Sequence, residues 1–409
     1  MIYRAPKGTD DILPPASADW LMAERAFFDL AERYGYGLVL TPLFESTELF
    51  SRGIGEDTEV VEKQMYTFTD KGGRSVTLRP EATASVVRAV IQAGGVIGTF
   101  KGCYWGPMFR YERPQKGRRR QFSQAGIEYL GAEAPDADVE VIEFGYQFLE
   151  TLGVRDVEVQ LNSIGDGADR VAYRAELVAF LESRKRELSA DAVRRLYENP
   201  LRVLDSKADA EVVADAPTPA DYLSPAAGAH FAAVRDGLDA ASIPYRISPT
   251  LVRGLDYYNR TVWEYVPLGF EAAQSSVGGG GRYDLLFEML GGKPTPSVGL
   301  AMGLDRILLA RERAEAQPTL DAFIIVADPE RGPEARALVR RLRTSGLRAD
   351  MVAGERSVKA QFKAADRAGA AYAVVVGEEW DEGRVAARDL ATGVQDVVAL
   401  QEIETWLRS

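Results

Sequence analysis

The sequence predicts an α+β protein of two domains, the first built on an antiparallel sheet and carrying a helical insertion. Three patterns indicate this. Short strand-like runs joined by turns follow residue 66, a charged, Ala-rich helical pattern fills residues 165–242, and strands alternate with helices after residue 321. We therefore predict a first domain over residues 1–318, with its insertion at about 165–242, and an α/β domain over residues 319–409.

The first domain is predicted to begin with a helix and continue in strands. Trp20, Phe27 and Tyr34 recur every seven residues within residues 16–34, which is typical of a helix with one buried face. The run LVLTPLFE at residues 38–45 predicts a strand. Its proline favours a sheet edge or a bulge, because proline cannot donate a hydrogen bond to a neighbouring strand.

Two hairpins are predicted next. Residues 65–70 and 74–80 alternate in polarity around the turn DKGG, and the helical pattern of residues 81–93 follows. Strand-like runs at 102–112 and 124–132 flank a basic segment, so that segment is predicted to be the loop of the second hairpin. A helix at residues 136–153 and a strand at residues 156–165 complete the part before the insertion.

Strands are predicted to resume at residues 244–266, after the insertion. The four consecutive glycines at 278–281 predict either a sharp turn or a backbone that a ligand approaches closely. Residues 296–316 predict a last helix of the first domain. The second domain then alternates strands and helices, which predicts a mostly parallel or mixed sheet; its segments are residues 322–327, 333–346, 348–352, 357–369 and 371–378.

Composition and charge exclude several classes. The chain has 409 residues, 46% of them hydrophobic, which is enough for more than one packed core. Its net charge of −12 argues against an unspecific nucleic-acid binder, since such binding depends on clustered cations. A nucleic-acid partner would need a local basic patch. Residues 110–120 supply one, with the cations Arg110, Arg113, Lys116, Arg118, Arg119 and Arg120 against a single acid, Glu112.

Cysteine and histidine each occur once. Cys103 and His230 cannot form an intrachain disulfide or a structural zinc site, so no metal held by Cys or His is expected. His230 lies in an ordinary helical pattern and is expected to be structural. The N-terminus has no leader pattern and no run approaches the ~18 apolar residues of a membrane span, so we expect a cytoplasmic protein without membrane contact.

Glycine-rich and basic segments indicate a nucleotide, yet no GxxxxGK[ST] loop and no strand-linked GxGxxG opening a helix is present. ATP would then have to be held by arginines presented from a sheet. A guanidinium makes planar, two-point contacts with phosphate and remains charged at any working pH. Arg110, Arg253 and Arg306 each lie beside a strand-like or Gly-bounded segment.

Several motifs, in order, cover nearly the whole chain. FRYERPQKGRRRQF with QAGIEYLG resembles motif 2 of the class II aminoacyl-tRNA synthetases, and VGLAMGLDRILL resembles motif 3. LVRGLDYYNRTVWEY and GGGGRYD are similar to the two signature peptides of the histidyl-tRNA synthetases. Further segments of that family resemble KGTDDILP, TLRPEAT and NPLRVLDSK in this chain. The resemblance implies a class II catalytic domain with a helical insertion and a C-terminal anticodon-binding domain.

The resemblance also implies a reaction. Histidine and ATP would form histidyl-adenylate, and the acyl group would pass to histidine tRNA. Arg110 and Arg253 match the family's contacts with the α-phosphate, and Arg118 and Arg306 match those with the terminal phosphates. Mg²⁺ is expected with ATP. Together with Gln124, Arg253 and Arg110 are the expected catalytic residues.

The implied histidine site divides into two parts. The ammonium ligands are Glu81, Thr83 and Gln124, and the imidazole ligands are Glu128 and Tyr257, with Tyr258 beside them. A neutral imidazole has one donor and one acceptor, so a carboxyl group and a phenol on its two edges would select it. Asp256 and Glu264 are expected to support the strand and its arginines.

Partners are implied at both ends of the chain. Arg113, Gln115, Lys116 and Arg119 would meet the acceptor stem of the tRNA. Lys359, Lys363 and Arg367 recur every four residues on one helix of the C-terminal domain; this pattern alone favours a solvated face, and the resemblance raises the case for tRNA contact. Motif 1, around Pro42, implies a homodimer.

The chain departs from the family at Ala82, Ser123 and Ala360. The main alternative is a non-catalytic, synthetase-like regulatory subunit of ATP phosphoribosyltransferase. A tRNA-binding scaffold without catalysis is a third hypothesis. The retained motif 2 arginines, Arg253 and the C-terminal domain favour the enzyme.

Overall fold

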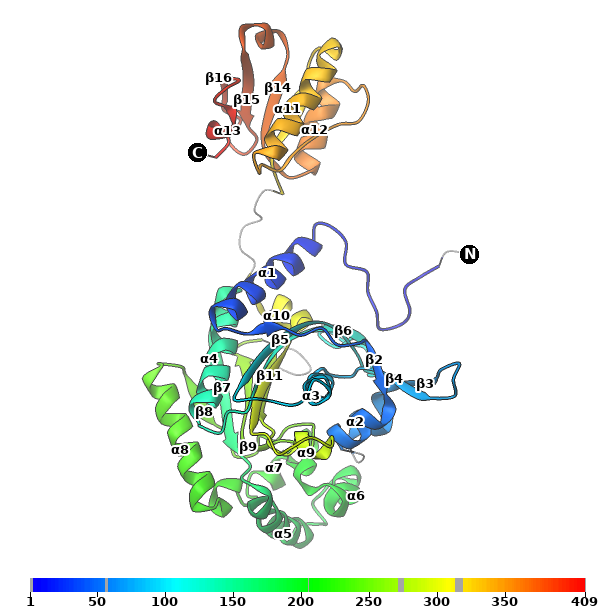
Figure 1. Cartoon of the computed structure of the whole chain (residues 1–409), viewed down its shortest axis with the longest axis vertical. Coiled ribbons are helices and arrows are strands. Elements are labelled where there is room, and N and C mark those ends of the chain that lie inside the picture. Colours follow the sequence, from blue (N-terminus) through cyan, green and yellow to red (C-terminus); the bar gives the residue numbers. More distant parts are fainter. Residues whose placement is uncertain (1–2, 56–57, 205, 271–275, 313–318, 409) are drawn as a thin grey trace. The chain divides into compact units, whose positions relative to one another are not determined.

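The computed structural model describes residues 3–55, 58–204, 206–270, 276–312 and 319–408 (Figure 1). It divides into two compact units, Met1–Glu312 and Arg313–Ser409. The predicted boundary between residues 318 and 319 borders a stretch, 313–318, that lies outside the described residues. Within the described ranges, no helix is both long and apolar enough to cross a membrane.

The first unit is built on an eight-stranded sheet. In spatial order its strands are β1 (Gly37–Leu38), β5 (Phe100–Phe109), β6 (Gln121–Leu130), β11 (Ser297–Gly303), β10 (Gly278–Arg282), β9 (Asn259–Pro267), β7 (Val157–Ser163) and β8 (Tyr245–Ile247). All neighbours are antiparallel except the two outermost pairs, β1–β5 and β7–β8. The predicted antiparallel sheet is confirmed, and β5 and β6 form the predicted hairpin around the basic loop.

The two faces of this sheet bury different layers. On one face lie α1 (Ser17–Arg33), α4 (Asp136–Thr151) and α8 (Pro225–Ala240). The other face packs on α3 (Thr83–Gln92) and α9 (Leu286–Met289). Side chains alternate along a strand, so Ala125 and Ile127 of β6 point into the first layer. Gln124 and Glu128 therefore lie on the α3 side.

A three-stranded sheet borders the α3 side. Its spatial order is β2 (Phe44–Ser46), β4 (Ser75–Leu78) and β3 (Tyr66–Thr69). In the chain, α2 (Thr47–Ile54) directly follows β2. The hairpin predicted around DKGG is confirmed as β3 and β4. The single strand predicted over residues 38–45 is wrong. That run is divided between β1 and β2, which belong to different sheets, and Pro42 lies in the connection.

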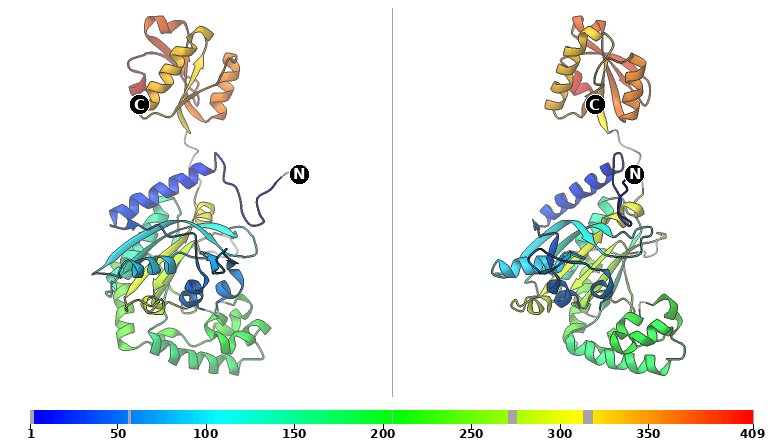
Figure 2. Two further views of the ribbon diagram at one scale, coloured as in Figure 1. Left: turned by 45° about the vertical axis from the view of Figure 1, so that its right-hand side comes forward. Right: turned by 90° about the vertical axis from the view of Figure 1, so that its right-hand side faces the viewer.

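The helical insertion consists of α5 (Gly167–Ser183), α6 (Ala190–Glu198) and α7 (Ala210–Val213), with short 3-10 helices at Pro200–Val203, Lys207–Asp209 and Pro219–Tyr222. Its apolar side chains form a core of their own. Figure 2 shows these helices in green, on the side of the unit away from α1. In contrast, α8 contributes Phe231, Val234 and Leu238 to the main core, so the separately packed part ends before α8.

Three sequence predictions after the insertion are wrong in detail. Residues 251–258 are a loop between β8 and β9, and the glycines at 278–281 form the buried strand β10. The helix predicted over 296–316 is the strand β11 followed by α10 (Leu304–Ala310), and residues 313–316 lie outside the described part. A short apolar run fits a buried strand as well as a helix, and pairing with β6 and β10 decides for the strand.

The second unit has a mixed five-stranded sheet, as predicted. Its order is β13 (Ala349–Met351), β12 (Leu320–Val326), β14 (Ala370–Val376), β15 (Arg384–Asp389) and β16 (Gln395–Ala399). The first three strands are parallel and the last two are antiparallel. Three helices accompany them, α11 (Gly332–Thr344), α12 (Val358–Arg367) and α13 (Ile403–Trp406).

Candidate active site

Glu128 is the centre of a buried polar cluster on the α3 side of the sheet. Its side chain has no exposed area. The Thr83 hydroxyl donates to Glu128 Oε1 at 2.6 Å, and the Tyr283 hydroxyl donates to Glu128 Oε2. Gly299 lies opposite on β11, where a Cβ would come within 1.9 Å of Oε2. The motif 3 glycine therefore leaves the space that the carboxyl group occupies.

The protonation of Glu128 follows from its surroundings. Burial raises the pKa of Glu128 to about 8, and Glu81 also raises it, whereas the hydrogen bonds from Thr83 and Tyr283 lower it. At neutral pH the carboxyl group therefore holds a proton for much of the time. Such a group can share that proton with an imidazole. Neutral imidazole beside a carboxylic acid and imidazolium beside a carboxylate contain the same protons and differ only in which group holds one of them.

Glu81 lies just before α3 and is also buried. Its carboxylate accepts from the backbone amide of Thr83 at 2.7 Å and from that of Ala84 at 2.9 Å. These amides belong to the first turn of the helix, where N–H groups have no partner within the helix. Burial raises the pKa of Glu81, while the two amides and Arg110 lower it. Glu81 and Thr83 are thus placed together by the start of one helix.

Three tyrosines cover the same cluster. The rings of Tyr257 and Tyr258 have centroids 4.6 Å apart, and Tyr257 meets Tyr283 at 5.6 Å with an edge-to-face angle of 69°. Burial raises the pKa of all three phenols, so they remain hydrogen-bond donors at neutral pH. Gly281 of β10 makes room for Tyr258, since a Cβ there would lie 2.6 Å from the ring.

Gln124 lies on β6, four residues before Glu128 and on the same face of the strand. It is paired opposite Gly106 on β5 and Gly303 on β11, so no neighbouring side chain crowds it from those positions. Its Oε1 is buried and has no hydrogen-bond partner among the described residues. A buried acceptor without a partner costs free energy, which makes this oxygen available to a ligand with a donor.

Arg110 and Arg253 are held in defined positions. Arg110 follows β5, donates from Nε to the carbonyl of Pro80 at 2.9 Å, and lies over the Phe122 ring at 5.5 Å. The Arg253 guanidinium forms an ion pair with Glu264 of β9. The prediction that Glu264 supports an arginine is confirmed.

Arg306 and Arg118 complete a cationic group. Arg306 Nε donates to the carbonyl of Gly117 at 2.9 Å, and its Nη1 donates to that of Ser276 at 3.1 Å. Arg118 pairs with Glu112 at 2.9 Å. Burial lowers the pKa of Arg306, and the positive charges of Arg118 and Arg110 lower it further. Arginines that repel one another in this way are suited to a polyanion, which would relieve the repulsion.

The basic loop divides into free and paired cations. Arg113 and Lys116 are exposed, as is Gln115. Arg119 differs, because it forms ion pairs with Asp10 at 3.0 Å and with the buried Asp305 at 2.9 Å. In this conformation Arg119 fastens the loop to α10, and its predicted contact with tRNA would have to replace those carboxylates.

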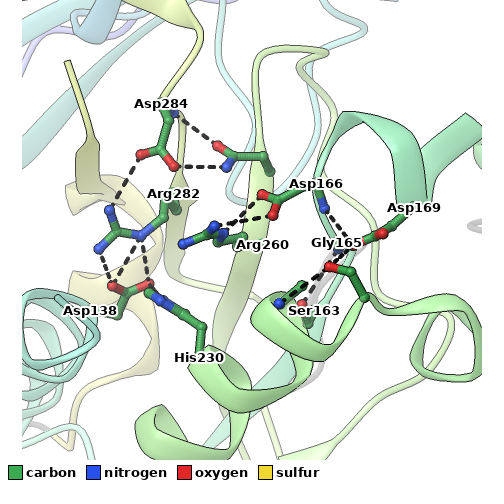
Figure 3. A network of polar contacts seen from close by, with 12 residues as sticks. Asp138, Ser163, Gly165, Asp166, Asp169, His230, Arg260, Arg282 and Asp284 are labelled. Atoms are coloured by element: carbon green, nitrogen blue, oxygen red, sulfur yellow. Dashed lines mark hydrogen bonds and ion pairs between the residues drawn. The ribbon is translucent and has the colours of Figure 1, made fainter. Parts of the chain in front are cut away.

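A second network supports the site from behind (Figure 3). Arg282, at the end of β10, is fully buried and ion-paired with Asp138 of α4. His230 Nε2 lies 3.4 Å from Asp138 Oδ1, so the single histidine belongs to this structural network, as expected. Asp284 accepts from Asn259 Nδ2 at 2.9 Å and donates its amide to Asn259 Oδ1 at 2.8 Å. This pair joins the residue that follows Tyr258 to the residue that follows Tyr283.

The glycine run in β10 does not make the sharp turn that was one of its two predicted roles, because it is a strand paired with both β9 and β11. The other predicted role, close approach of a ligand, stays a prediction. A Cβ at Gly279 would lie 2.9 Å from Arg253 Nη1, and one at Gly280 would lie 2.6 Å from the Trp263 ring. The glycines therefore accommodate large side chains of neighbouring segments.

Sequence reasoning missed Tyr283 as a member of the site. The tyrosine stands in the quoted peptide GGGGRYD, one residue beyond β10, but nothing in the sequence indicates its contact with Glu128, which is 155 positions away. Arg170 of the insertion was missed as well. Its Nη1 donates to the carbonyls of Asp256 and Tyr258 at 3.3 and 2.9 Å and so holds the 251–258 loop.

Comparison with known proteins covers the whole chain. The family model described as "Histidyl-tRNA synthetase" matches residues 8–307, and "Anticodon binding domain" matches residues 321–409. A histidine–tRNA ligase of Desulforudis audaxviator (strain MP104C) is 46% identical over 417 residues, covering 100% of this chain and 99% of that protein.

Solved structures agree. The apo histidyl-tRNA synthetase of S. aureus is similar with a TM-score of 0.79 and 35% identity, and all of both chains is covered. A Bacillus halodurans protein described as an ATP phosphoribosyltransferase regulatory subunit/histidyl-tRNA synthetase has a TM-score of 0.67 at 22% identity, covering 92% of this chain and all of its own. That second likeness shows the fold alone.

Proposed function

Because the chain belongs to the histidyl-tRNA synthetase family and ligates L-histidine to histidine tRNA at the expense of ATP, we propose that the cluster around Glu128 and the adjoining arginines is its active site. One observation carries the proposal. A buried acid–tyrosine group fit for an imidazole and an ammonium adjoins arginines fit for phosphates: the Arg253 guanidinium lies 5.8 Å from the centre of the Tyr258 ring, and Arg110 donates to the carbonyl of Pro80, next to Glu81. Both substrates would meet there.

In the first step the histidine carboxylate attacks the α-phosphate of ATP and pyrophosphate leaves. Negative charge accumulates in the in-line transition state, so fixed cations are the main requirement. We assign Arg110 and Arg253 to the α-phosphate. Their anchors, the Pro80 carbonyl and Glu264, keep both guanidinium groups in place before substrate arrives. Arg118 and Arg306 would bind the terminal phosphates.

Mg²⁺, when bound with ATP, would neutralise phosphate charge. Among the described residues no three His, Cys, Asp or Glu side chains are grouped to hold a metal. Mg²⁺ in such sites takes one or two carboxylates and otherwise phosphates and water. Glu112 and Glu264 would supply such carboxylates, since they already pair with Arg118 and Arg253, the arginines assigned to the phosphates.

Histidine would be recognised by the buried acids and phenols. Glu81, Thr83 and the unpaired Gln124 Oε1 would take the ammonium group. Glu128 would share its proton with one ring nitrogen, and Tyr257, with Tyr258 beside it, would reach the other. An apolar analogue would leave these buried groups without partners, so discrimination of order ~10⁴ is expected without an editing site.

The transfer step needs a base for the ribose hydroxyl of the tRNA. We propose that a non-bridging phosphate oxygen of the adenylate takes this proton and that Gln124 orients the groups. A Gln124→Ala variant should then transfer the acyl group from preformed adenylate at least tenfold more slowly in a single turnover. Transfer at the parental rate would remove Gln124 from the step.

The tRNA would meet both units. Arg113, Gln115 and Lys116 are exposed and free to contact the acceptor stem, and Arg119 could join them after leaving its carboxylates. Lys359 and Lys363 are exposed on α12 of the anticodon-binding domain and remain predicted contacts. Residues 1–318 and 319–409 are the proposed catalytic and anticodon-binding domains.

We also propose a homodimer and a cytoplasmic location, where charged tRNA is used. The motif 1 region supports the dimer. Leu38, Leu40, Leu43 and Phe44 are all exposed around Pro42, and Leu40 is 81% exposed. Several exposed large apolar side chains within one short segment are typical of an interface.

One assay tests the function. Histidine-dependent exchange of pyrophosphate into ATP, followed by charging of a histidine tRNA transcript, should both occur with the purified protein. A folded, dimeric preparation that lacks exchange would contradict the enzyme and agree with the regulatory subunit. Exchange without charging would limit the protein to adenylate formation.

A further inference from the structure

Arg119 of the basic loop is held between two segments that are far apart in the sequence. Its guanidinium group pairs with Asp10 Oδ2 at 3.0 Å and with Asp305 Oδ1 at 2.9 Å. Asp10 belongs to the irregular segment that precedes α1, and Asp305 lies in the first turn of α10. One side chain of the loop therefore joins the N-terminal segment to the helix that carries Arg306.

Asp305 also fixes the start of β6. Its Oδ2 accepts from the backbone amide of Ser123 at 3.1 Å, one residue before Gln124. Burial raises the pKa of Asp305, whereas the Ser123 amide and the charge of Arg119 lower it. A buried carboxylate needs such partners, because it has lost its contacts with water. Removing the Arg119 charge would thus disturb Asp305 as well as the loop.

The residues on either side of Arg118 are both fastened to α10. Arg306 Nε donates to the carbonyl of Gly117 at 2.9 Å, and Arg119 pairs with Asp305. Gly117 has a φ of +74°, and a Cβ there would lie 3.3 Å from Arg306 Cγ. Arg118 lies between these two anchors, close enough to Arg306 for its charge to lower the pKa of Arg306, which burial lowers most.

The N-terminal segment holds the next residue of the loop. The backbone amide of Arg120 donates to the carbonyl of Gly8 at 2.7 Å. Gly8 has a φ of +88°, which favours glycine, and a Cβ there would lie 2.7 Å from Arg120 Cγ. Residues 8–10 therefore form a strap across the end of the basic loop, fastened by this hydrogen bond and by the ion pair between Asp10 and Arg119.

These contacts favour positioning over tRNA binding as the role of Arg119. Two carboxylates face one guanidinium group, so a tRNA phosphate that approached Arg119 would also be repelled by Asp10 and Asp305. Arg113 and Lys116 are exposed on the same loop and are better placed to meet phosphates of a large ligand.

We propose that Arg119 is a positioning residue for ATP. Held by Asp10 and Asp305, it keeps Arg118 and Arg306 oriented towards the terminal phosphates before ATP binds. The inference rests on the proposed function, which assigns Arg118 and Arg306 to those phosphates. Arg119 itself touches neither ATP nor histidine and acts through its neighbours in the loop and in α10.

Arg119→Gln in the full chain tests this role. Its KM for ATP in histidine-dependent pyrophosphate exchange should rise about tenfold or more, because a buried carboxylate loses its partner and the loop loses an anchor. The KM for histidine and the Kd for a histidine tRNA transcript should stay within about twofold of the parental values. Arg119→Lys should recover part of the ATP affinity, since an ammonium group can pair with one carboxylate.

Arg246→Gln is the matched control for the lost charge. Arg246 also pairs with a carboxylate at 2.9 Å, that of Glu158, but it lies on β8, the last strand of the sheet. This variant should leave both KM values and the tRNA Kd unchanged.

Gly8→Ala tests the strap without removing a charge. The added Cβ would meet the Arg120 side chain and shift the end of the loop, so the KM for ATP should rise about threefold or more while the KM for histidine stays parental. Gly35→Ala is its control, because Gly35 also has a positive φ, +76°, but a Cβ there would have no atom within 4 Å. Gly35→Ala should leave both KM values unchanged.

Three results for Arg119→Gln would overturn the proposal. Equal increases in the KM values for ATP and histidine would indicate a general structural effect. An increase in the tRNA Kd larger than that in the KM for ATP would make Arg119 a tRNA contact. Parental values throughout would leave Arg119 without a role in adenylate formation. If Arg119→Gln does not fold, the comparison of Gly8→Ala with Gly35→Ala decides, and equal KM values for ATP in these two would overturn the proposal.

Failure of this proposal differs from failure of the proposed function. A parental protein without pyrophosphate exchange would contradict the function itself. Normal exchange in the parental protein, with no selective change in the KM for ATP in either variant, would leave the function standing and remove only the positioning role of Arg119.

Discussion

At the scale of single residues, the protonation of Glu128 would decide how the proposed site binds histidine. Glu128 is completely buried and receives hydrogen bonds from Thr83 and Tyr283 on its two oxygens. Its pKa of about 8 lies above the ordinary value near 4.5 because burial disfavours the charge. The site thus stores a proton that it can share with the substrate ring.

Glu128→Gln tests the role of this proton, because glutamine keeps the shape of the side chain but has no titratable proton. Between pH about 4.5 and 8 the native protein holds a proton that the unfolded chain has lost, so the parental free energy of unfolding falls as pH rises through this window. The glutamine variant should lose this pH-dependent part of the free energy of unfolding. Its melting temperature should therefore fall less between pH 5 and 8 than that of the parental protein.

The same variant should bind histidine poorly. Its KM for histidine in pyrophosphate exchange should rise about 10- to 100-fold, since a hydrogen bond to a charged group contributes roughly 1.5–3 kcal/mol. Glu133→Gln, at an exposed carboxylate, is the control and should change neither quantity. An unchanged pH profile in Glu128→Gln would show that the carboxyl group is already ionised in the native protein.

At the scale of elements, the helical insertion holds the loop that carries the tyrosines. Arg170 of α5 donates to the carbonyls of Asp256 and Tyr258. Near the same end of α5, Arg260 pairs with Asp166 at 2.8 Å, and its amide donates to the carbonyl of Gly165 at 2.8 Å (Figure 3). The insertion is therefore bonded to the loop that carries Tyr257 and Tyr258, and we propose that Arg170 positions this loop at the proposed histidine site.

Arg170→Ala should raise the KM for histidine about tenfold or more, with a smaller effect on the KM for ATP, because two charge-assisted hydrogen bonds to the loop are lost. Steady-state pyrophosphate exchange measures both. Arg170→Lys should restore part of the affinity, which a purely structural role would not require.

Arg174→Ala provides the control on the same helix, since the Arg174 guanidinium donates to the carbonyl of Tyr197, which lies within the insertion. Equal increases in both KM values for Arg170→Ala, or the same effect in Arg174→Ala, would mean that the insertion affects overall stability and not the loop.

At the scale of the whole molecule, a single chain leaves several large apolar side chains around Pro42 exposed to solvent. Leu38 and Phe44 are each more than half exposed, and Leu40 more so. The region connects the edge strand β1 to the smaller sheet. A second copy of the chain would cover both the side chains and the sheet edge.

Leu40→Lys should therefore weaken the proposed dimer. A lysine buried without a partner costs several kcal/mol, so the dimer Kd should rise at least 100-fold in sedimentation equilibrium. Val171→Lys is the control, because Val171 is 71% exposed but lies on the insertion helix α5. A parental protein that sediments as a monomer at micromolar concentration would contradict the homodimer.

Much of this protein could be predicted from the order of its residues. Alternation and turns indicated the antiparallel sheet, and βα alternation indicated the mixed C-terminal sheet; both are local patterns with short periods. The ordered motifs indicated the family and its reaction. The acids and tyrosines that the resemblance assigned to histidine do come together around Glu128.

Other features depended on contacts between distant segments. Only the fold brings Tyr283 and Thr83 to the two oxygens of Glu128, fills the space beside the β10 glycines with Arg253 and Tyr258, and pairs Arg119 with Asp305. It also places α11 and α12 on opposite faces of one sheet. Sequence determines which side chains exist and their local period, whereas burial, pairing and protonation arise from neighbours that are distant in the chain.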